Sequence, residues 1–146
     1  MSVEILSPKH ISAVAEIETL CFTAPWSESS LTLLLKDGNF GVVSMNGDTV
    51  CAYAGLIVAL DEGEITNVAT HPLYRRQGHA KATLLTLLEQ AKIRGITRIT
   101  LEVRETNTAA KALYESLGFG VCGKRKNFYS QPREDALILE IKTGEG

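Results

Sequence analysis

The chain has 146 residues, is 45% hydrophobic, and carries 15 basic and 17 acidic residues for a formal net charge of −2 at pH 7. A chain of this length buries roughly 68–70% of its unfolded surface, so we expect a single domain over residues 1–146. The balanced charge argues against bulk nucleic-acid binding and like-charged tails, and we predict no direct nucleic-acid partner.

Neither the cysteines nor the N-terminus predicts a secreted, metal-binding or membrane protein. Cys21, Cys51 and Cys122 form no CxxC pair, which argues against a disulfide framework or a zinc site. The N-terminus lacks a basic segment followed by an apolar block, and no apolar run reaches the roughly 18 residues that a membrane span needs. We therefore predict a cytoplasmic protein without a metal or a membrane partner, and its oligomeric state stays open.

The first half of the chain predicts one strand, two helices and then three strands. The expected ranges are a strand over 3–6, helices over 8–21 and 28–36, and strands over 40–45, 49–60 and 64–70. Ser7 and Ser27 are suited to cap the two helices, because a serine hydroxyl accepts a hydrogen bond from a free N–H of the first turn. Asn46-Gly47 favours a type I′ hairpin, so we expect the last three strands to form an antiparallel meander.

The second half predicts helices and strands in alternation. The expected ranges are a helix over 78–94, a strand over 97–104, a helix over 108–117 capped by Asn107, and strands over 119–124 and 136–142 around a polar loop over 127–135. A strand–helix–strand crossover is nearly always right-handed and makes its two strands parallel. The whole order, β-α-α-β-β-β-α-β-α-β-β, predicts an α/β fold with a mixed sheet.

The segment Arg75-Arg76-Gln77-Gly78-His79-Ala80 joins a predicted strand to a predicted helix and has the features of a phosphate-binding loop. The N–H groups at a helix start, together with the helix dipole, attract an anion. Gly78 has no Cβ, so the main chain can approach the anion closely, and Arg75 and Arg76 add charged planar donors. Taken alone, such a loop is more often an ordinary connection between a strand and a helix, so other residues must decide whether it binds phosphate.

Two residues downstream are candidates for acid–base chemistry. Alternation places Glu102 on the face of its strand opposite Leu101 and Val103. It is either a solvated glutamate or a partly desolvated general base that acts directly or through one water. Tyr114, on the following predicted helix, is either a core tyrosine or a general acid for a departing thiolate.

The loop matches Arg-x-x-Gly-x-Ala and resembles the coenzyme A pyrophosphate loop of the GCN5-related N-acetyltransferase (GNAT) family. The chain is most similar to the family's bacterial ribosomal-protein alanine N-acetyltransferases. That similarity lies in Ala24-Pro25-Trp26-Ser27-Glu28, Leu101-Glu102-Val103-Arg104, Asn107, Ala109-Ala110, Ala112-Leu113-Tyr114-Glu115-Ser116-Leu117-Gly118-Phe119, Arg125, Asn127, Tyr129 and Arg133-Glu134-Asp135-Ala136. The resemblance covers nearly the whole chain. It implies the acyl-CoA N-acyltransferase fold, in which two parallel central strands separate at one end and hold the thioester between them.

The resemblance also implies roles for residues at matching positions. Glu102 would accept a proton from the amine, and Tyr114 would donate one to the thiolate that leaves the cosubstrate, acetyl-CoA. The main chain of Val68, Ala69 and Thr70 would pair with the pantetheine arm, with the N–H of Val68 polarising the thioester carbonyl. Asn107 would contact the coenzyme, and the pyrophosphate would be held by Arg76, Gln77, Gly78, His79, Ala80 and Lys81.

Three positions depart from the commonest family pattern. Ala80 stands where many members have a second glycine, and His71 stands where an acidic residue is frequent. His79 lies in the loop itself, where we expect an exposed residue rather than a catalyst. These departures bear on cofactor affinity and not on the reaction.

The implied acceptor is a protein N-terminal α-amine, in the ribosomal case the N-terminal alanine of the small-subunit protein S18. An α-amine has a pKa of about 7.7–8.0 against about 10.4 for lysine, so roughly a tenth of it is already neutral at pH 7. The groove that binds the acceptor is expected between residues 22–26 and 127–135. For Phe22 and Trp26, packing in the core is favoured over contact with the substrate. The candidates to orient the peptide are Glu18, Tyr129 and Glu134.

Other functions remain open on the residues alone. A dinucleotide-binding protein needs three glycines in G-x-G-x-x-G, whereas this loop has one, and the triphosphate-binding pattern G-x-x-x-x-G-K-[ST] is absent. A non-catalytic acetyl-CoA-binding module is disfavoured by the presence of both Glu102 and Tyr114. A GNAT enzyme that acts on a small-molecule amine or a lysine stays an alternative, because a fold does not determine its substrate.

Overall fold

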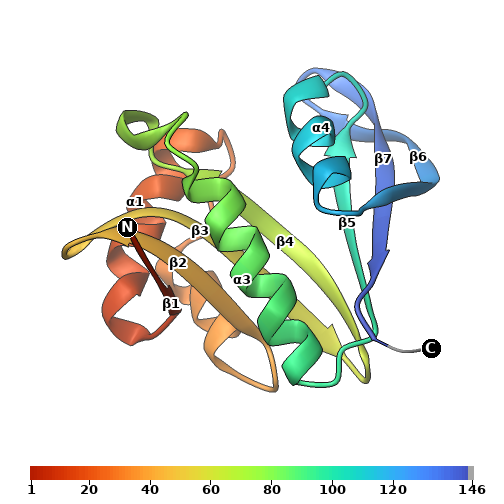
Figure 1. Ribbon diagram of the computed structural model, residues 1–146. Coiled ribbons are helices and arrows are strands. Elements are labelled where there is room, and N and C mark those ends of the chain that lie inside the picture. Colours follow the sequence, from red (N-terminus) through yellow and green to blue (C-terminus); the bar gives the residue numbers. More distant parts are fainter. Residues whose placement is uncertain (145–146) are drawn as a thin grey trace.

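The computed structural model describes residues 1–144, so the last two residues of the expected 1–146 domain lie outside the described part. One seven-stranded sheet runs through it in the order β1-β2-β3-β4-β5-β7-β6 (Figure 1). The elements are β1 (Ser2–Ile5), a 3-10 turn (Pro8–His10), α1 (Ile11–Cys21), α2 (Glu28–Leu31), a 3-10 turn (Thr32–Leu35), β2 (Phe40–Asn46), β3 (Thr49–Ala59), β4 (Glu62–Thr70), a 3-10 turn (Pro72–Tyr74), α3 (His79–Ile93), β5 (Arg98–Arg104), α4 (Thr108–Ser116), β6 (Gly120–Ser130) and β7 (Arg133–Lys142). Among the strands of residues 1–144, only β4 and β5 pair in parallel, which confirms the mixed α/β fold.

The N-terminal half follows the expected elements closely. Strands β2, β3 and β4 form the antiparallel meander, and Asn46 pairs with Thr49 across a two-residue connection. Ser27 caps α2 as expected, because its hydroxyl accepts a hydrogen bond from the N–H of Ser30 (3.1 Å). The expected helix over 28–36 is wrong in its form: α2 covers only the first turn, and a 3-10 turn follows it.

The expected polar loop over 127–135 is also wrong. Strand β6 runs to Ser130 and β7 begins at Arg133, so only two residues connect them. The register of the pair shifts between Arg125 and Tyr129. Such an irregularity interrupts the period-2 alternation by which a strand is recognised in a sequence, and it bends the strand.

Two apolar cores cover the two faces of the first half of the sheet. Helix α3 packs on one face, where its buried Leu84 belongs to the same cluster as Val42 of β2. Helices α1 and α2 pack on the other face, where Ile17 and Leu31 cluster with Val43. Neighbouring residues of β2 therefore enter opposite cores, as strand geometry requires. A sheet covered on both faces is a rigid support for the strand edges described below.

The sheet splits between β4 and β5. These strands pair only from Glu62, opposite Arg98, to Glu64, opposite Thr100. Beyond that point they diverge, and in Figure 1 the half that holds α4, β6 and β7 stands apart from the half that holds α1 and α3. The separation of the two parallel central strands that the family resemblance implied is therefore present.

A bulge on β4 lies just past the last residue that pairs with β5. Ala54 pairs with Val68 and Leu56 pairs with Ile65, so two residues of β4 lie opposite the single Gly55. A Cβ at Gly55 would come within 2.7 Å of a methyl carbon of Leu34. Glycine at this position therefore allows the crowded bulge, and a bulge bends and twists the strand that carries it.

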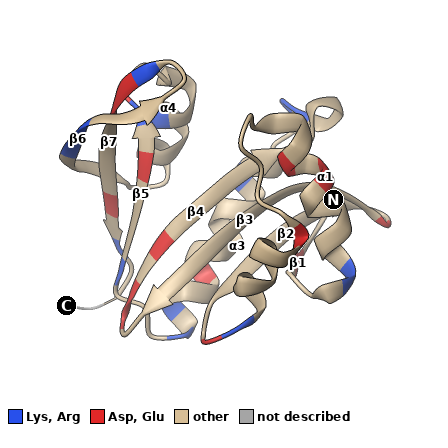
Figure 2. Cartoon of the chain, turned by 180° about the vertical axis from the view of Figure 1, so that it is seen from behind, with Lys and Arg blue, Asp and Glu red and all other residues tan. Residues whose placement is uncertain are grey.

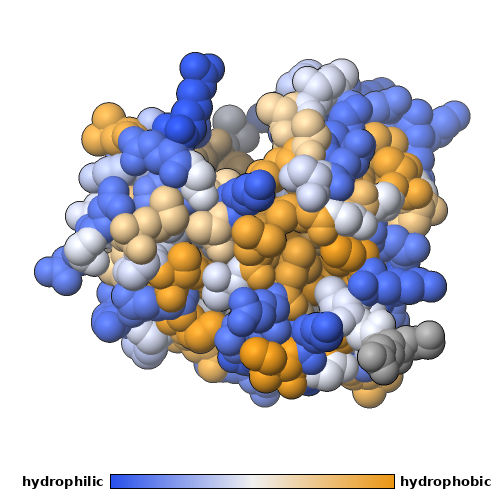
Figure 3. Space-filling model, viewed as in Figure 1, coloured by the Kyte–Doolittle hydropathy of each residue, from blue (hydrophilic) through white to orange (hydrophobic). Residues whose placement is uncertain are grey.

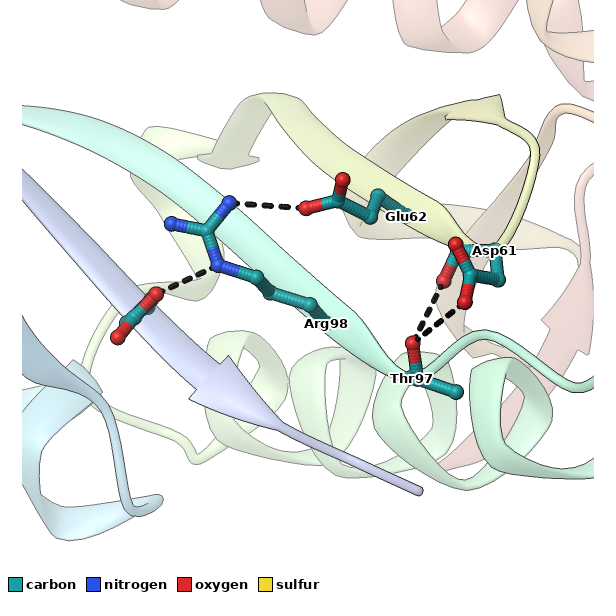
Figure 4. A network of polar contacts seen from close by, with 5 residues as sticks. Asp61, Glu62, Thr97 and Arg98 are labelled. Atoms are coloured by element: carbon teal, nitrogen blue, oxygen red, sulfur yellow. Dashed lines mark hydrogen bonds and ion pairs between the residues drawn. The ribbon is translucent and has the colours of Figure 1, made fainter. Parts of the chain in front are cut away.

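Polar side chains close the base of the split, where β4 and β5 still pair (Figure 4). The guanidinium of Arg98 donates to Glu62 on β4 (2.9 Å) and to Glu140 on β7. Beside it, the hydroxyl of Thr97 donates to the carboxylate of Asp61 (3.1 Å). Arg98 thus links three adjacent strands at the point from which the two halves diverge.

The surface carries both signs of charge, spread over both halves rather than gathered in one block (Figure 2). The face that bears α3 shows a broad apolar area (Figure 3), and α3 carries the exposed Leu85 and Ile93. Within residues 1–144, no helix is both long and apolar enough to cross a membrane.

Candidate active site

The split between β4 and β5 opens into a cleft of about 680 Å³. Figure 3 shows the surface hollowed between the two halves at the top of the view. The segments 22–26 and 128–131 both contribute to its walls, so the two expected sides of the acceptor groove lie at one cavity. The candidate site residues that line it are Glu18, Val68, Glu102, Asn107, Tyr114 and Tyr129.

Strand β4 leaves one edge without a strand partner along this cleft. Its other edge pairs with β3 up to Thr70, whereas its pairing with β5 stops at Glu64. An unpaired strand edge presents N–H and C=O groups that can bond to an extended ligand. Val68 borders the cleft, while Ala69 is buried and the carbonyl of Thr70 accepts a hydrogen bond from the thiol of Cys21 (3.3 Å).

The predicted phosphate-binding loop ends at the first turn of α3. Gly78 has the left-handed conformation (φ 84°), and the helix begins with His79. The N–H of Ala82 donates to the carbonyl of Gly78 (3.0 Å). The N–H groups of residues 79–81 therefore precede the helical hydrogen-bond ladder and are free to bind an anion. Arg76 also has a positive φ of 63°.

The expectation that His79 is exposed is wrong. Its side chain is buried, and its Nδ1 lies 2.6 Å from the hydroxyl of Ser44 on β2. Its ring also meets the edge of Tyr74. Burial lowers the pKa of His79, which keeps the ring neutral. The imidazole therefore fastens the start of α3 to the sheet, and only the main chain of this residue remains a candidate for contact with an anion.

Glu102 projects from β5 into the cleft with its side chain 16% exposed. Burial raises the pKa of its carboxyl group, the nearby guanidinium of Arg125 lowers it, and Glu64 raises it further. The Nε of Arg125, on β6, lies 3.3 Å from the carboxylate. A carboxylate with a raised pKa is better matched to proton abstraction near neutral pH than a solvated one.

Tyr114 comes from α4 and borders the same cleft. Its ring belongs to the apolar core and packs edge-on against Phe119, with the ring centroids 5.7 Å apart. Burial raises the pKa of the phenol to about 12, so the group is protonated throughout the physiological range. A packing role and a role as general acid are compatible for Tyr114, because its ring packs in the core while the residue also borders the cavity.

Asn107 has the structural role that its sequence position suggests. Its side-chain oxygen accepts a hydrogen bond from the N–H of Ala110 (3.1 Å) and caps α4. It also borders the cleft, so capping does not exclude the contact to the coenzyme that the resemblance implies.

The three candidates for orienting a peptide differ in their surroundings. Tyr129 borders the cleft, and Arg104 stacks on its ring at 4.3 Å. Glu134 is not among the residues that line the cavity: its carboxylate accepts a hydrogen bond from the N–H of Thr106 (2.6 Å) and pairs with Arg104 (3.3 Å). Glu18 borders the cavity but its side chain is fully buried. Of the three, Tyr129 is the most open to a ligand.

Reasoning from the sequence did not assign a role to Asn67 or Arg125. Asn67 interrupts the otherwise apolar run that precedes the loop, and this signal could have marked it. Arg125 lies in the C-terminal stretch that carried the family resemblance, but its contact with Glu102 crosses β7. No spacing in the sequence reveals a contact between strands that are not sequence neighbours.

Comparisons with known proteins decide the family. The acetyltransferase (GNAT) family matches residues 11–119. The chain belongs to the GNAT family. It is 35% identical to the ribosomal protein bS18-alanine N-acetyltransferase of Haemophilus ducreyi over 95% of this chain and 98% of that protein. The crystal structure of the ribosomal-protein-S18-alanine N-acetyltransferase from Escherichia coli superposes with a TM-score of 0.92 at 33% identity, covering 99% of this chain and 95% of that one.

GNAT enzymes use acetyl-CoA as their acetyl donor. The hydrogen-bonding groups described above, at the start of α3 and along the edge of β4, suit that cosubstrate. The structure of yncA, a putative acetyltransferase from Salmonella typhimurium solved with its cofactor acetyl-CoA, has the same fold, with a TM-score of 0.81 at 20% identity, covering 99% of this chain and 95% of that chain. Free N–H groups at the start of α3 suit a pyrophosphate, and the open edge of β4 suits an extended amide-containing arm.

A Gly78→Val substitution should weaken acetyl-CoA binding by about tenfold or more, because a β-branched residue resists the positive φ that this loop needs. Gly95→Val is the matched control: Gly95 follows the other end of α3 with a φ of 80°, and neither glycine has an atom within 4 Å of an added Cβ. Calorimetry should show normal affinity for the control. Equal affinity of the two variants would contradict the assignment of the loop.

Proposed function

We propose that this chain transfers the acetyl group of acetyl-CoA to the N-terminal α-amine of a protein, namely the N-terminal alanine of ribosomal protein bS18. Relatives that carry this activity in their names align along almost the whole chain at 33–35% identity. The observation that carries the proposal is the convergence of Glu102 and Tyr114 on one cleft between the open edge of β4 and the segments 22–26 and 128–131.

The donor side of the proposed reaction uses main-chain groups. The N–H groups at the start of α3 bind the pyrophosphate, and the edge of β4 pairs with the pantetheine arm. The N–H of Val68 donates to the thioester oxygen, on which negative charge develops during attack. Asn107 contacts the coenzyme from the wall formed by α4.

The acceptor side uses Glu102 and Tyr114, whose pKa values are raised by burial. Glu102 takes the proton from the α-ammonium group directly or through one water, and the neutral amine attacks the thioester carbon. As the carbon–sulfur bond breaks, Tyr114 donates its phenolic proton to the departing sulfur, and the surplus proton on the nitrogen passes directly or through water to the phenolate as the amide forms. Because burial disfavours a free thiolate as well as a free phenolate, the same apolar surroundings that keep Tyr114 protonated also favour protonation of the sulfur beside it.

Of the two kinds of protein amine, an α-amine needs less help from a general base such as Glu102 to lose its proton. Its pKa of about 7.7–8.0 leaves roughly a tenth of it neutral at pH 7, against well under a thousandth for a lysine side chain with a pKa of about 10.4. The cleft opens between two segments rich in aromatic residues, Phe22 and Trp26 on one side and Phe128 and Tyr129 on the other. This arrangement suits an extended peptide end.

A thiol-release assay with acetyl-CoA tests the proposal. The panel holds peptides with the bS18 N-terminus, the same peptides with a changed first residue, and an N-terminally blocked peptide that contains lysine. Turnover should be fastest with the N-terminal alanine and absent with the blocked peptide. Comparable turnover of the blocked peptide would instead support a lysine acceptor, and turnover of small amines alone would support a small-molecule acceptor.

Arg125→Gln should move the acidic limb of the pH–rate profile to higher pH. The guanidinium lowers the pKa of Glu102, so removing it lets burial and Glu64 raise that pKa further. Since the base must be deprotonated, activity then appears only at higher pH. Arg125→Lys, which keeps the charge, should move the limb less.

The control for this prediction is Lys126→Gln, which removes a positive charge from the next position of β6. The titration of the acceptor amine is common to all variants, so differences report the enzyme. A ¹³C NMR titration of the Glu102 carboxyl group measures its pKa directly. A carboxyl that titrates identically in wild type and Arg125→Gln would show that the ion pair does not act on the base.

A further inference from the structure

Glu18 is a buried carboxylate on α1 whose two oxygens are both occupied by donors of this chain. Its Oε1 accepts a hydrogen bond from the main-chain N–H of Trp26 (2.8 Å). Its Oε2 accepts hydrogen bonds from the hydroxyl of Tyr53 and from the side-chain amide of Asn67 (3.1 Å). The side chain is 0% exposed, so neither oxygen is open to a ligand that enters from solvent.

Two of these hydrogen-bond donors belong to different segments that line the cleft. Trp26 lies in the segment that connects α1 to α2, on the side proposed for the acceptor. Asn67 lies in the bulge of β4, next to the residue whose N–H we assign to the thioester. The third donor, Tyr53, lies on β3 in the buried core beneath them. One carboxylate therefore joins the acceptor segment 22–26 to the bulge of β4, next to the proposed thioester site.

Apart from the packing of Trp26 against the apolar core formed with α1 and α2, the acceptor segment has little other support. In the described part of the chain, the bond to Glu18 is the one hydrogen bond that fastens residues 23–26. The neighbouring Phe22 continues the helix through a bond from its N–H to the carbonyl of Glu18 (2.9 Å). A connection whose residues make one hydrogen bond becomes more mobile when that bond is lost, because loops otherwise sample many conformations.

We propose that Glu18 is a positioning residue, which holds the acceptor segment 22–26 at a set distance from the thioester-binding bulge and does not itself touch the acceptor. The proposal rests on the proposed function for its kinetic consequences and on geometry alone for its structural ones. A carboxylate suits the task because it accepts several hydrogen bonds and donates none. Glutamine would present an NH₂ group to donors, leaving at least one of them unsatisfied.

The single tryptophan of the chain reports directly on this segment, because Trp26 is the only one. In Glu18→Gln, acrylamide should quench the Trp26 fluorescence severalfold more efficiently than in wild type. The KM for the peptide should rise about tenfold, the scale of one lost charge-assisted hydrogen bond, while the KM for acetyl-CoA stays within about twofold. If Glu18→Gln does not fold, Glu18→Asp withdraws the carboxylate by one methylene and should give the same two results.

Tyr53→Phe is the matched control, since it removes a buried hydrogen bond to the same carboxylate but keeps the bonds from Trp26 and Asn67. It should leave the quenching and the peptide KM within about twofold of wild type, even if its Tm falls. Unchanged quenching in the Glu18 variants, or equal effects in Tyr53→Phe, would overturn the proposal. A wild-type protein that acetylates no peptide would contradict the proposed function while leaving the quenching result to judge Glu18.

Discussion

Replacing Glu102 by glutamine should lower kcat by about 10²–10⁴-fold, the usual contribution of a general base. Glutamine keeps the size of the side chain and its place on β5, but it cannot take a proton at neutral pH. Binding of acetyl-CoA should survive, because the groups assigned to it lie on β4, α3 and Asn107. Steady-state kinetics with a peptide substrate, and calorimetry with acetyl-CoA, separate the two effects.

The pH dependence of this variant is as informative as its rate. In wild type, activity should rise with pH as the Glu102 carboxyl, whose pKa burial has raised, loses its proton. In the glutamine variant that dependence should vanish and only the titration of the acceptor amine should remain. Glu105→Gln, at a nearby half-buried position that pairs with Lys124 (3.1 Å), is the control and should be nearly as active as wild type. Full turnover by Glu102→Gln at neutral pH would remove this residue from the mechanism.

Tyr114→Phe should slow thiol release by a similar factor of about 10²–10⁴. The substitution deletes only the hydroxyl group, so the ring can keep its edge-on packing against Phe119. We therefore expect an unchanged Tm and an unchanged affinity for acetyl-CoA alongside the lost rate. Because the pKa of Tyr114 is raised to about 12, wild type should show no alkaline loss of activity from this group below about pH 10.

A rate within twofold of wild type in Tyr114→Phe would mean that water or another group protonates the sulfur. Tyr129 is the neighbouring phenol at the cleft, and burial raises its pKa as well. Tyr129→Phe is therefore the informative companion variant. If Tyr129→Phe loses kcat and Tyr114→Phe does not, the acid has been assigned to the wrong tyrosine.

Local sequence signals predicted most of the fold because most of its elements are specified locally. Alternation and helical spacing placed β5 and α3 to within a residue or two, and Ser27 and Asn107 cap their helices as expected. The signals failed where the backbone is irregular. The register of β6 shifts between Arg125 and Tyr129, so the alternation of side chains is interrupted there, and the sequence predicts a loop instead of the second half of the strand.

The candidate site shows the same division. The sequence predicted Glu102, Tyr114 and the loop around Gly78 as candidate site residues, because each lies in a short local pattern. The prediction of an exposed His79 was wrong, since the hydroxyl that pairs with its buried ring belongs to Ser44, 35 residues away in the sequence. The partners of Glu18 were equally hidden: they come from the α1–α2 connection, β3 and β4.

By itself, the sequence determined the alternation of elements, the family and the residues able to exchange protons, because short-range patterns encode backbone preference and chemical type. Only the tertiary structure decided how these residues are used. The split of β4 from β5 leaves one strand edge open, and burial sets the pKa of Glu102 and Tyr114. Those properties depend on which distant groups exclude water from a side chain, and on which of them pair with it, and no local pattern specifies either.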